Sequence, residues 1–249
     1  NTPEGKALAA AFANAYNNLI IAMRDYQPQE VKGGLGKGGK LGKSGIPAAV
    51  VSKYLWERGL VVEKTGLYSF LILFSLGITR GKWSSMVDAL ADFKTDYDRN
   101  APLARTLPSI AGARAYAGWG LRDLCEALHA CYRDNDTAVA MNAMYTELPE
   151  PAMTPADAYD RLVHGSVEPV GIDQLKGRVT AVMIVPYPPG IPLIMPGERF
   201  STDSIIDYLK FARDTDDRFP GFEADVHGLR FDIDKQGHKT WLVDCVKEK

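Results

Sequence analysis

The sequence predicts a mixed α/β fold, and three observations carry this prediction. Residues 48–58 place apolar side chains at helical spacing, two β-rich runs follow at 60–65 and 68–76, and a second helical pattern begins after Thr79. Helix, two strands and helix is the layout of a small α/β sandwich. Further along, strand-like and helical patterns continue to mix, as expected for an α+β domain that follows the sandwich.

Composition limits the class of protein. The 249 residues are 46% hydrophobic and 24% charged, with a net charge of −2, so no basic excess exists to meet the phosphates of a nucleic acid. The three cysteines, Cys125, Cys131 and Cys245, have neither disulfide-framework nor zinc spacing, which favours a reducing cytoplasm. No apolar run reaches the roughly 18 residues that span a bilayer, and no signal peptide is apparent, so we expect no membrane partner.

The first 43 residues differ in texture from the rest. Residues 5–27 predict an amphipathic helix that Pro28 ends, and a Gly/Lys-rich stretch follows. Its end, Gly42-Lys43-Ser44, matches a phosphate-binding loop, but the first glycine of that motif falls on Lys37. We therefore interpret residues 1–43 as a helix and a flexible linker.

Residues 44–100 supply the predicted sandwich. Pro47 and Gly59 bracket the first helix. The run 68–76 is nearly all apolar, which predicts a central strand covered on both faces. The helix after Thr79 has this apolar stripe: Trp83, Met86, Val87, Leu90, Phe93 and Tyr97.

Residues 101–249 predict a second, α+β domain. A connection with prolines at 102 and 108 covers 100–108, and Thr154-Pro155 has the form of a helix start. The remaining expected elements are a helix at 121–135, a strand at 177–185, a helix capped by Ser201 or Thr202, and a strand at 241–246.

A proline-rich segment, Val185–Glu198, follows the strand at 177–185. Its five prolines, at 186, 188, 189, 192 and 196, fix their own φ angles and keep the preceding residues out of the helical region. The gaps between them hold Val, Ile, Leu, Ile and Met rather than polar residues. A segment that is both stiff and apolar predicts a buried wall that determines shape.

This segment, Val-Pro-Tyr-Pro-Pro-Gly-Ile-Pro-Leu-Ile-Met-Pro-Gly-Glu, resembles the C-terminal signature of the bacterial ornithine/lysine/arginine decarboxylases, which are pyridoxal-phosphate enzymes of fold type I. Residues 219–228, Phe-Pro-Gly-Phe-Glu-Ala-Asp-Val-His-Gly, are similar to the closing motif of that family, and residues 61–83 resemble the end of its aminotransferase-like part. The resemblance covers about 44–249 and is closest to the lysine decarboxylases. It implies a small aminotransferase-like domain at 44–100 and the decarboxylase C-terminal domain at 101–249.

Glu63 is the first candidate site residue. It lies in a β-rich run among residues that favour burial, so its carboxylate must find a cation or donors, with Arg80 as one structural partner. The resemblance implies a functional alternative, in which an acid here receives the distal amine of the substrate through charge-assisted hydrogen bonds. Thr65, Tyr68 and Ser69 are expected to line the same substrate pocket.

The proline-rich motif supplies the second group of candidates. By resemblance, Pro186, Tyr187, Pro188, Pro189, Gly190 and Glu198 form an access-channel or packing element. His227 has either a functional or interface role or a local hydrogen bond in a turn, and His129, among Leu and Cys on a helix, is expected to be structural. The four histidines share no metal-ligand spacing, so no metal is expected.

Catalysis is expected to need more than this chain. Pyridoxal phosphate requires a lysine for its Schiff base, and the family carries it in a Ser-x-His-Lys-type motif. The sole His-Lys pair here is His238-Lys239, close to the C-terminus, so we predict no catalytic residue and no bound cofactor for this chain alone.

Three hypotheses follow for the role of the chain in polyamine metabolism. It is the C-terminal portion of a decarboxylase that converts a basic amino acid to a diamine, within a homo-oligomer. Alternatively, it is a non-catalytic paralogue that binds a full-length decarboxylase subunit and modulates it, or it is an inactive chimeric fragment.

Overall fold

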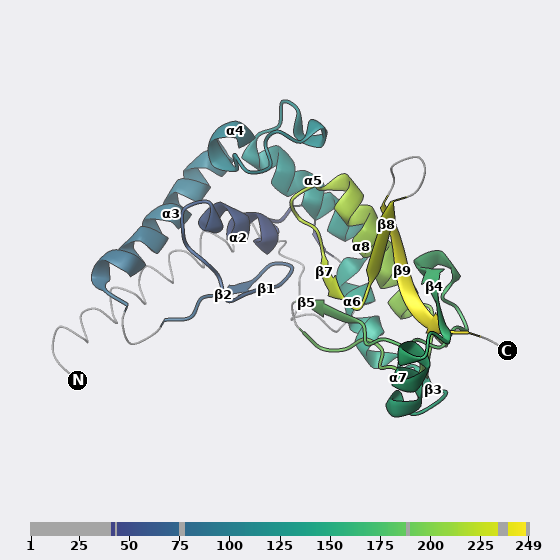
Figure 1. Ribbon diagram of the computed structural model, residues 1–249. Helices are drawn as coiled ribbons and strands as arrows, with labels where there is room; N and C mark the ends of the chain where they lie inside the picture. Colours follow the sequence, from purple (N-terminus) through teal and green to yellow (C-terminus); the bar gives the residue numbers. More distant parts are fainter. Residues whose placement is uncertain (1–40, 43, 75–77, 188–189, 234–238, 248–249) are drawn as a thin grey trace. The chain divides into compact units, whose positions relative to one another are not determined.

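A computed structural model describes residues 41–42, 44–74, 78–187, 190–233 and 239–247 (Figure 1). The expected helix at 5–27 and most of the expected linker lie outside the described residues. The contacts group the chain into two compact units that divide between Asp136 and Thr137, and each is described by itself.

Helices dominate the first unit, and the predicted ones are confirmed. Its elements are α2 (Ala48–Trp56), α3 (Arg80–Asp98), α4 (Leu103–Thr106), the 3₁₀ helix η1 (Arg114–Tyr116) and α5 (Leu121–Asp134). Helix α3 packs against both α2 and α5. The predicted stripe of α3 lies inward at Met86, Leu90, Phe93 and Tyr97, because residues three and four apart share one face of a helix.

The strands of the first unit are much shorter than the sequence predicts. Strand β1 (Lys64–Thr65) pairs antiparallel with β2 (Phe70–Leu71), and the two make a sheet of their own. The prediction of a central strand at 68–76 is wrong for its described residues, since Leu71 is 55% exposed and Leu73 is 67% exposed. An apolar run becomes a central strand only where other strands and layers cover it, and no other described strand pairs with this hairpin.

A buried carboxylate joins the first two helices of this unit. The hydroxyl of Tyr54, on α2, donates a hydrogen bond of 2.8 Å to Oδ2 of Asp96, on α3. Asp96 also pairs with Arg105, and the guanidinium of Arg58 lies 3.3 Å from the centroid of the Tyr54 ring. Burial and the bond to Asp96 raise the pKa of Tyr54, so its hydroxyl remains a donor. These partners make burial of the Asp96 charge tolerable.

The boundary between the units differs from the one expected at 100/101. Asn100, with φ of +47°, places its side chain at the start of α5, where Oδ1 accepts the N–H groups of Arg122 and Asp123 at 3.0 and 3.2 Å. The N–H of Gly120 and the amide of Asn100 both donate to Asp123, and these two bonds lower the pKa of its carboxyl. Because this cap ties α5 to the end of α3, residues 101–136 belong with the first unit.

In its described residues, the second unit combines three α-helices with three small sheets. The helices are α6 (Thr137–Thr146), α7 (Pro155–Val163) and α8 (Ser204–Arg218), with the 3₁₀ helix η2 at Ile172–Gln174. Strands β4 (Val167–Gly171), β9 (Lys239–Val246) and β8 (Arg230–Ile233) form one antiparallel sheet in that order. Strand β3 (Glu150–Pro151) pairs with β6 (Glu198–Arg199), and β5 (Val185–Tyr187) pairs with β7 (Asp225–His227).

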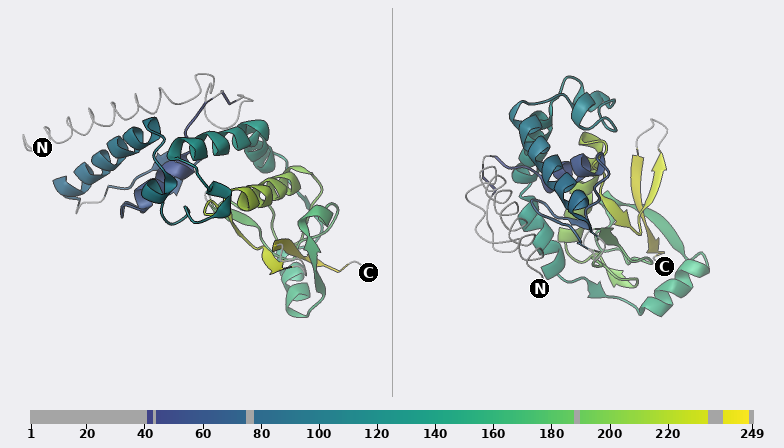
Figure 2. Two further views of the ribbon diagram at one scale, coloured as in Figure 1. Left: turned by 90° about the horizontal axis from the view of Figure 1, so that it is seen from above. Right: turned by 90° about the vertical axis from the view of Figure 1, so that its left-hand side faces the viewer.

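Strand β9 is the centre of the second unit's core. Burial alternates along it, and Trp241, Val243 and Cys245 face inward because side chains two apart share one face of a strand. They join one cluster with Leu209 and Ala212 of α8, and α8 lies against α6 (Figure 2). The predicted strand at 241–246 is confirmed.

Other predictions for the second unit are confirmed in part. The side chain of Thr154 accepts the N–H of Asp157 at 3.2 Å, so α7 starts where predicted. Helix α8 exists, but it begins at Ser204 after Asp203 rather than after Ser201 or Thr202. The strand expected at 177–185 is replaced by isolated bridges at Val179, Thr180 and Ile184, because each of these residues pairs with a different segment.

Replacement of Tyr54 by Phe tests the buried carboxylate. The change removes one donor from Asp96, so we expect the free energy of unfolding of the first unit to fall by about 1–3 kcal/mol. Urea unfolding followed by tryptophan fluorescence measures this, since three of the four tryptophans precede Asp136. The matched control is Tyr159→Phe, at a side chain 65% exposed on α7. Equal stability of the Tyr54→Phe variant and the wild type would contradict the assignment.

Candidate functional site

The structure brings the four predicted substrate residues together on the β1–β2 hairpin. The N–H of Glu63 donates to the carbonyl of Leu71 at 2.8 Å, and the N–H of Gly66 donates to that of Ser69 at 2.7 Å. Glu63, Thr65, Tyr68 and Ser69 therefore lie within one tight turn and its two short strands. Their role in substrate binding stays a prediction.

Glu63 is more exposed than its sequence context indicates. Its side chain reaches solvent, and no cation of the described residues lies within ion-pair distance of it, Arg80 included. The expectation of a buried, structurally paired acid is therefore wrong. The cause is the short hairpin, because no further described strand covers this face. Because this exposed carboxylate has no cationic partner in the part of the chain that the structure describes, it is available to a cation from elsewhere.

Thr65 is held from helix α2. Its Oγ1 lies 2.8 Å from Oγ of Ser52, and both side chains are partly buried. This bond fixes the position of β1 relative to α2. Thr65 therefore has a structural partner in addition to any contact with substrate.

Tyr68 takes part in a hydrogen-bonded chain through His129. Nε2 of His129 lies 3.0 Å from the carbonyl of Gly42, so this nitrogen must carry the proton, and Nδ1 is then an acceptor. The Tyr68 hydroxyl lies 2.6 Å from Nδ1 and donates to it. The prediction of a structural His129 is confirmed, but its link to Tyr68 gives no sequence signal because 61 positions separate the two residues.

Burial determines the protonation states of Tyr68 and His129 in this hydrogen-bonded chain. Burial lowers the pKa of His129, and it raises the pKa of Tyr68, so the neutral forms of both side chains persist at neutral pH. A methyl group added at Gly45 would stand 2.7 Å from Nδ1 of His129. The backbone at Gly45 therefore closes directly over the ring.

In the second unit the two family motifs meet as paired strands. Val185 lies opposite His227, Pro186 opposite Val226, and Tyr187 opposite Asp225. Sequence reasoning singled out both segments, but their pairing across about forty residues appears only in the structure. Pro188 and Pro189 lie outside the described residues.

The proline-rich segment is half buried rather than a buried wall. Leu193 and Ile194 enter the core, whereas Tyr187, Gly190 and Ile191 are exposed. Oε2 of Glu198 accepts the N–H of Met195 at 2.7 Å, which closes the end of the segment. Its described prolines, at 186, 192 and 196, likewise range from buried to exposed.

His227 is exposed and lies near one acid. Its Nε2 is 3.3 Å from Oδ1 of Asp225, two residues earlier on the same strand. This contact is local, but it lies in strand β7 and not in a turn. The functional or interface role of His227 stays a prediction.

Asp216 is a titratable group that sequence reasoning missed. Burial raises the pKa of its carboxyl to about 6, while its Oδ1 accepts the N–H of Ala224 at 2.7 Å. The other oxygen lies 3.8 Å from Nζ of Lys239, which also lies 4.0 Å from the centroid of the Phe231 ring. Lys239, the lysine of the sole His-Lys pair, thus has a structural setting.

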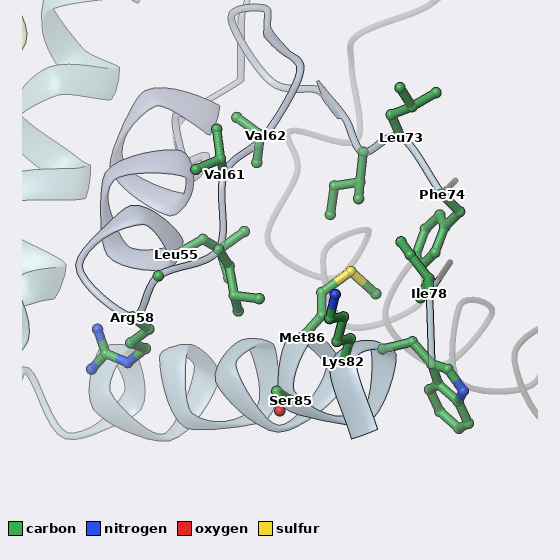
Figure 3. Close-up of a pocket in the computed structure, with 14 residues that line it drawn as sticks. Leu55, Arg58, Val61, Val62, Leu73, Phe74, Ile78, Lys82, Ser85 and Met86 are labelled. Carbon is green, nitrogen blue, oxygen red and sulfur yellow. The ribbon is translucent and has the colours of Figure 1, made fainter. Parts of the chain in front are cut away.

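A cavity of about 470 Å³ opens in the first unit (Figure 3). It is lined by the end of α2, the arms 60–62 and 72–74 of the hairpin, and the start of α3. The lining is mainly apolar, with Arg58, Lys82 and Ser85 as its polar side chains. We call it the hairpin groove.

Neither the hairpin groove nor the surroundings of Lys239 has the side chains of a pyridoxal-phosphate site. Such a site needs a lysine amine beside a carboxylate within a cavity, with donors for the phosphate. Lys82 lines the hairpin groove, but no acid is among the groove's described lining residues, and Lys239 is held by Asp216 and aromatic rings. The described part of the chain also holds no cluster of three metal-ligating side chains, and none of its helices is long and apolar enough to cross a membrane.

Comparison with known proteins identifies the family. Residues 138–247 match the family model for the Orn/Lys/Arg decarboxylase C-terminal domain, and residues 29–82 match the model for the major domain. The chain therefore belongs to the Orn/Lys/Arg decarboxylase family. The second match includes part of the Gly/Lys-rich stretch, which the motifs alone placed outside the resemblance.

Individual relatives are lysine decarboxylases. The chain is 62% identical over 219 residues to lysine decarboxylase LdcA of Pseudomonas aeruginosa, which covers 86% of this chain and 29% of LdcA. The solved structure of lysine decarboxylase A from Pseudomonas aeruginosa has a TM-score of 0.79 at 61% identity, over 86% of this chain and 29% of that chain. The constitutive lysine decarboxylase structure from Escherichia coli has a TM-score of 0.76 at 39% identity, over 83% and 29%. The chain thus spans less than a third of the length of these relatives.

Gly228, at the end of the second motif, has a testable role. Its φ is +89°, and a methyl group there would stand 1.9 Å from the carbonyl oxygen of Met183. We expect Gly228→Ala to lower the free energy of unfolding of the second unit by at least about 3 kcal/mol, through clash and backbone strain together.

The control for this variant is Gly165→Ala, where φ is +69° but no atom lies within 4 Å. Backbone strain alone predicts a loss of about 1–2 kcal/mol there. Urea unfolding followed by circular dichroism measures both variants, and equal losses would contradict the steric argument.

Buried His129 should make the stability of the first unit depend on pH. Its pKa in the folded state lies below the ordinary value of 6.5, so the unfolded chain takes up a proton first as the pH falls. Stability present at neutral pH is therefore lost as the pH drops below that value. We expect the urea midpoint of the first unit to fall between about pH 7.5 and about pH 5.5, and His129→Gln to flatten this slope.

Tryptophan fluorescence follows this transition, and His164→Gln, at an exposed histidine of the second unit, is the control that keeps the slope. A slope unchanged by His129→Gln would mean that other groups cause it.

Proposed function

We propose that this chain is the C-terminal portion of a pyridoxal-phosphate-dependent decarboxylase of basic amino acids, with lysine as its substrate. The observation that carries the proposal is the 62% identity to a lysine decarboxylase over 86% of the chain. The reaction removes the α-carboxyl group and yields a diamine. The three free, buried cysteines fit the cytoplasmic location that the sequence favours.

In this proposal the chain binds and orients the substrate but does not carry the cofactor. Bound pyridoxal phosphate would supply the electron sink for decarboxylation, and its lysine would come from the part of the family's length that this chain does not span. The poor fit of Lys82 and Lys239 to a cofactor site supports this division. The second unit would shape the entrance and the oligomer surface through β5, β7 and the turn that follows Pro186.

Glu63 would receive the distal ammonium of the substrate. Its carboxylate is exposed and has no cation among the described residues, so binding a substrate cation costs it no existing ion pair. Thr65 is held by the partly buried Ser52 and Tyr68 by the buried His129, which limits their motion beside Glu63. A hairpin whose residues are already held in position suits the recognition of a substrate whose distal amine lies at one fixed distance from its α-carbon.

A second candidate is a non-catalytic paralogue that binds a full-length decarboxylase and modulates it. The poor fit of Lys82 and Lys239 to a cofactor site favours it equally. An inactive chimeric fragment is the third alternative. Co-purification with an intact decarboxylase that changes that enzyme's rate would favour the second candidate over the first.

The experiment that tests the first candidate is complementation. The chain alone is expected to form no diamine from lysine, ornithine or arginine, and to show no Schiff-base absorption with added pyridoxal phosphate that borohydride fixes on a lysine. Co-expressed with the part of Pseudomonas aeruginosa LdcA that precedes the matched region, it is expected to restore lysine decarboxylation.

In the restored enzyme, Glu63→Gln is expected to lower kcat/KM for lysine by about 10–100-fold, because a charge-assisted bond to the distal amine is lost. Glu126→Gln, at an exposed acid on α5, is the matched control. Diamine formation by the chain alone, or full activity of the Glu63→Gln enzyme, would overturn the respective part of the proposal.

A further inference from the structure

The carboxyl group of Asp216 joins three elements of the second unit. It lies in the last turn of α8, and its Oδ1 accepts the N–H of Ala224 at 2.7 Å. Its Oδ2 lies 3.8 Å from Nζ of Lys239, on β9. Ala224 directly precedes β7, the strand that pairs with β5 of the proline-rich segment. The bond to Ala224 therefore holds the start of β7 against the end of α8.

The charge of this carboxylate is poorly compensated. The Asp216 side chain is 6% exposed, and its Oδ2 accepts no hydrogen bond from any described residue. The ammonium group of Lys239 lies beyond hydrogen-bond distance and also rests 4.0 Å from the centroid of the Phe231 ring. A buried carboxylate with few donors costs free energy, so this site accommodates the neutral acid more easily than the anion.

Two acids near Asp216 oppose its charge further. Glu223, in the segment between α8 and β7, and Asp217, the next residue of α8, both raise its pKa, whereas Lys239 lowers it. The carbonyl groups at the C-terminal end of α8 also disfavour a negative charge in the last turn. Lys239 is thus set against two acids and a helix end.

Helix α8 also packs against α6 and η2. The sequence of α6 contains no charged residue, and Asp173 of η2 pairs with Arg213 at 2.7 Å. Burial is therefore the largest cause that raises the pKa of Asp216 from its ordinary value of 3.8 to about 6.

Proton uptake by Asp216 favours the closed arrangement of this junction. Because the pKa is higher in the folded state than its ordinary value, the folded chain takes up the proton first as the pH falls. A local opening that detaches residues 219–224 from α8 exposes the carboxyl to water and restores its ordinary affinity for protons. Such an opening is easier at neutral pH, where the carboxyl is charged, and harder where it is protonated.

We propose that Asp216 is a pH-sensitive latch that holds residues 219–228 on the end of α8, loosely when its carboxyl is charged and firmly when it is protonated. These residues include β7, so the latch also controls how firmly the proline-rich segment keeps its partner strand. The latch does not depend on decarboxylase activity. Its sign is opposite to that of His129, whose protonation destabilises the first unit.

Hydrogen exchange at the Ala224 amide of the whole chain tests the latch. The protection factor removes the intrinsic pH dependence of exchange. It is expected to be about tenfold higher at about pH 5 than at about pH 7.5, since the carboxyl regains its ordinary proton affinity on opening. Asp216→Asn keeps a carbonyl acceptor for Ala224 but cannot titrate, so its protection factor is expected to stay within about twofold. Asp207→Asn, at an exposed acid on the same helix, is the matched control that keeps the tenfold rise.

Lys239→Met separates a latch from a constant ion pair. At about pH 7.5 it leaves the buried carboxylate without its cation, so the protection factor of Ala224 is expected to fall by about two- to fivefold. At about pH 5 the carboxyl is protonated, and the same variant is expected to match the wild type.

Circular dichroism of each variant confirms that it folds, and the wild-type and Lys239→Met measurements decide the matter even if Asp216→Asn does not. A wild-type protection factor that does not rise between about pH 7.5 and about pH 5 would overturn the inference. So would a rise that persists in Asp216→Asn, or an equal loss in Lys239→Met at both pH values.

Discussion

The hydrogen bond from Tyr54 to Asp96 holds α2 against α3, and these two helices support both the β1–β2 hairpin and the hairpin groove. Helix α2 carries Ser52, which positions Thr65 and hence the hairpin. Helix α3 carries Lys82 and Met86 into the groove lining. The buried carboxylate of Asp96 would be costly without its partners, Tyr54 and Arg105, so these side chains must stay in place. The positions of α2 and α3, and with them the hairpin and the groove, therefore depend on these contacts.

The hairpin combines rigid and available groups. Tyr68 is fixed through His129 to the carbonyl of Gly42, and Thr65 is fixed to Ser52. Two residues before Thr65, Glu63 keeps a carboxylate that has no cation within ion-pair distance among the described residues. Because Thr65 and Tyr68 are fixed, the neighbouring Glu63 carboxylate is already held in position before a ligand binds, which lowers the entropy that binding costs.

In the second unit, two motifs rich in glycine and proline pair with each other through β5 and β7 and still contribute side chains to the core. Strand β5 includes Pro186, which cannot donate to a ladder, and its pairing with β7 is therefore short. Gly228 allows the chain to pass the carbonyl of Met183 directly after that pairing. Leu193 and Ile194 then return the proline-rich segment to the core that Trp241 and α8 organise.

The sequence by itself determined helices α2, α3, α5 and α7, the strand at 241–246, the family and the two motifs, because helical spacing, capping residues such as Thr154 and fixed proline positions act locally. It also singled out Glu63 and Tyr68. The tertiary structure alone decided that 68–76 is not a central strand, that His129 holds Tyr68, and that residues 101–136 join the first unit. Each of these depends on a contact between distant positions, or on the lack of a covering layer among the described residues, and periodicity along the chain carries no record of either.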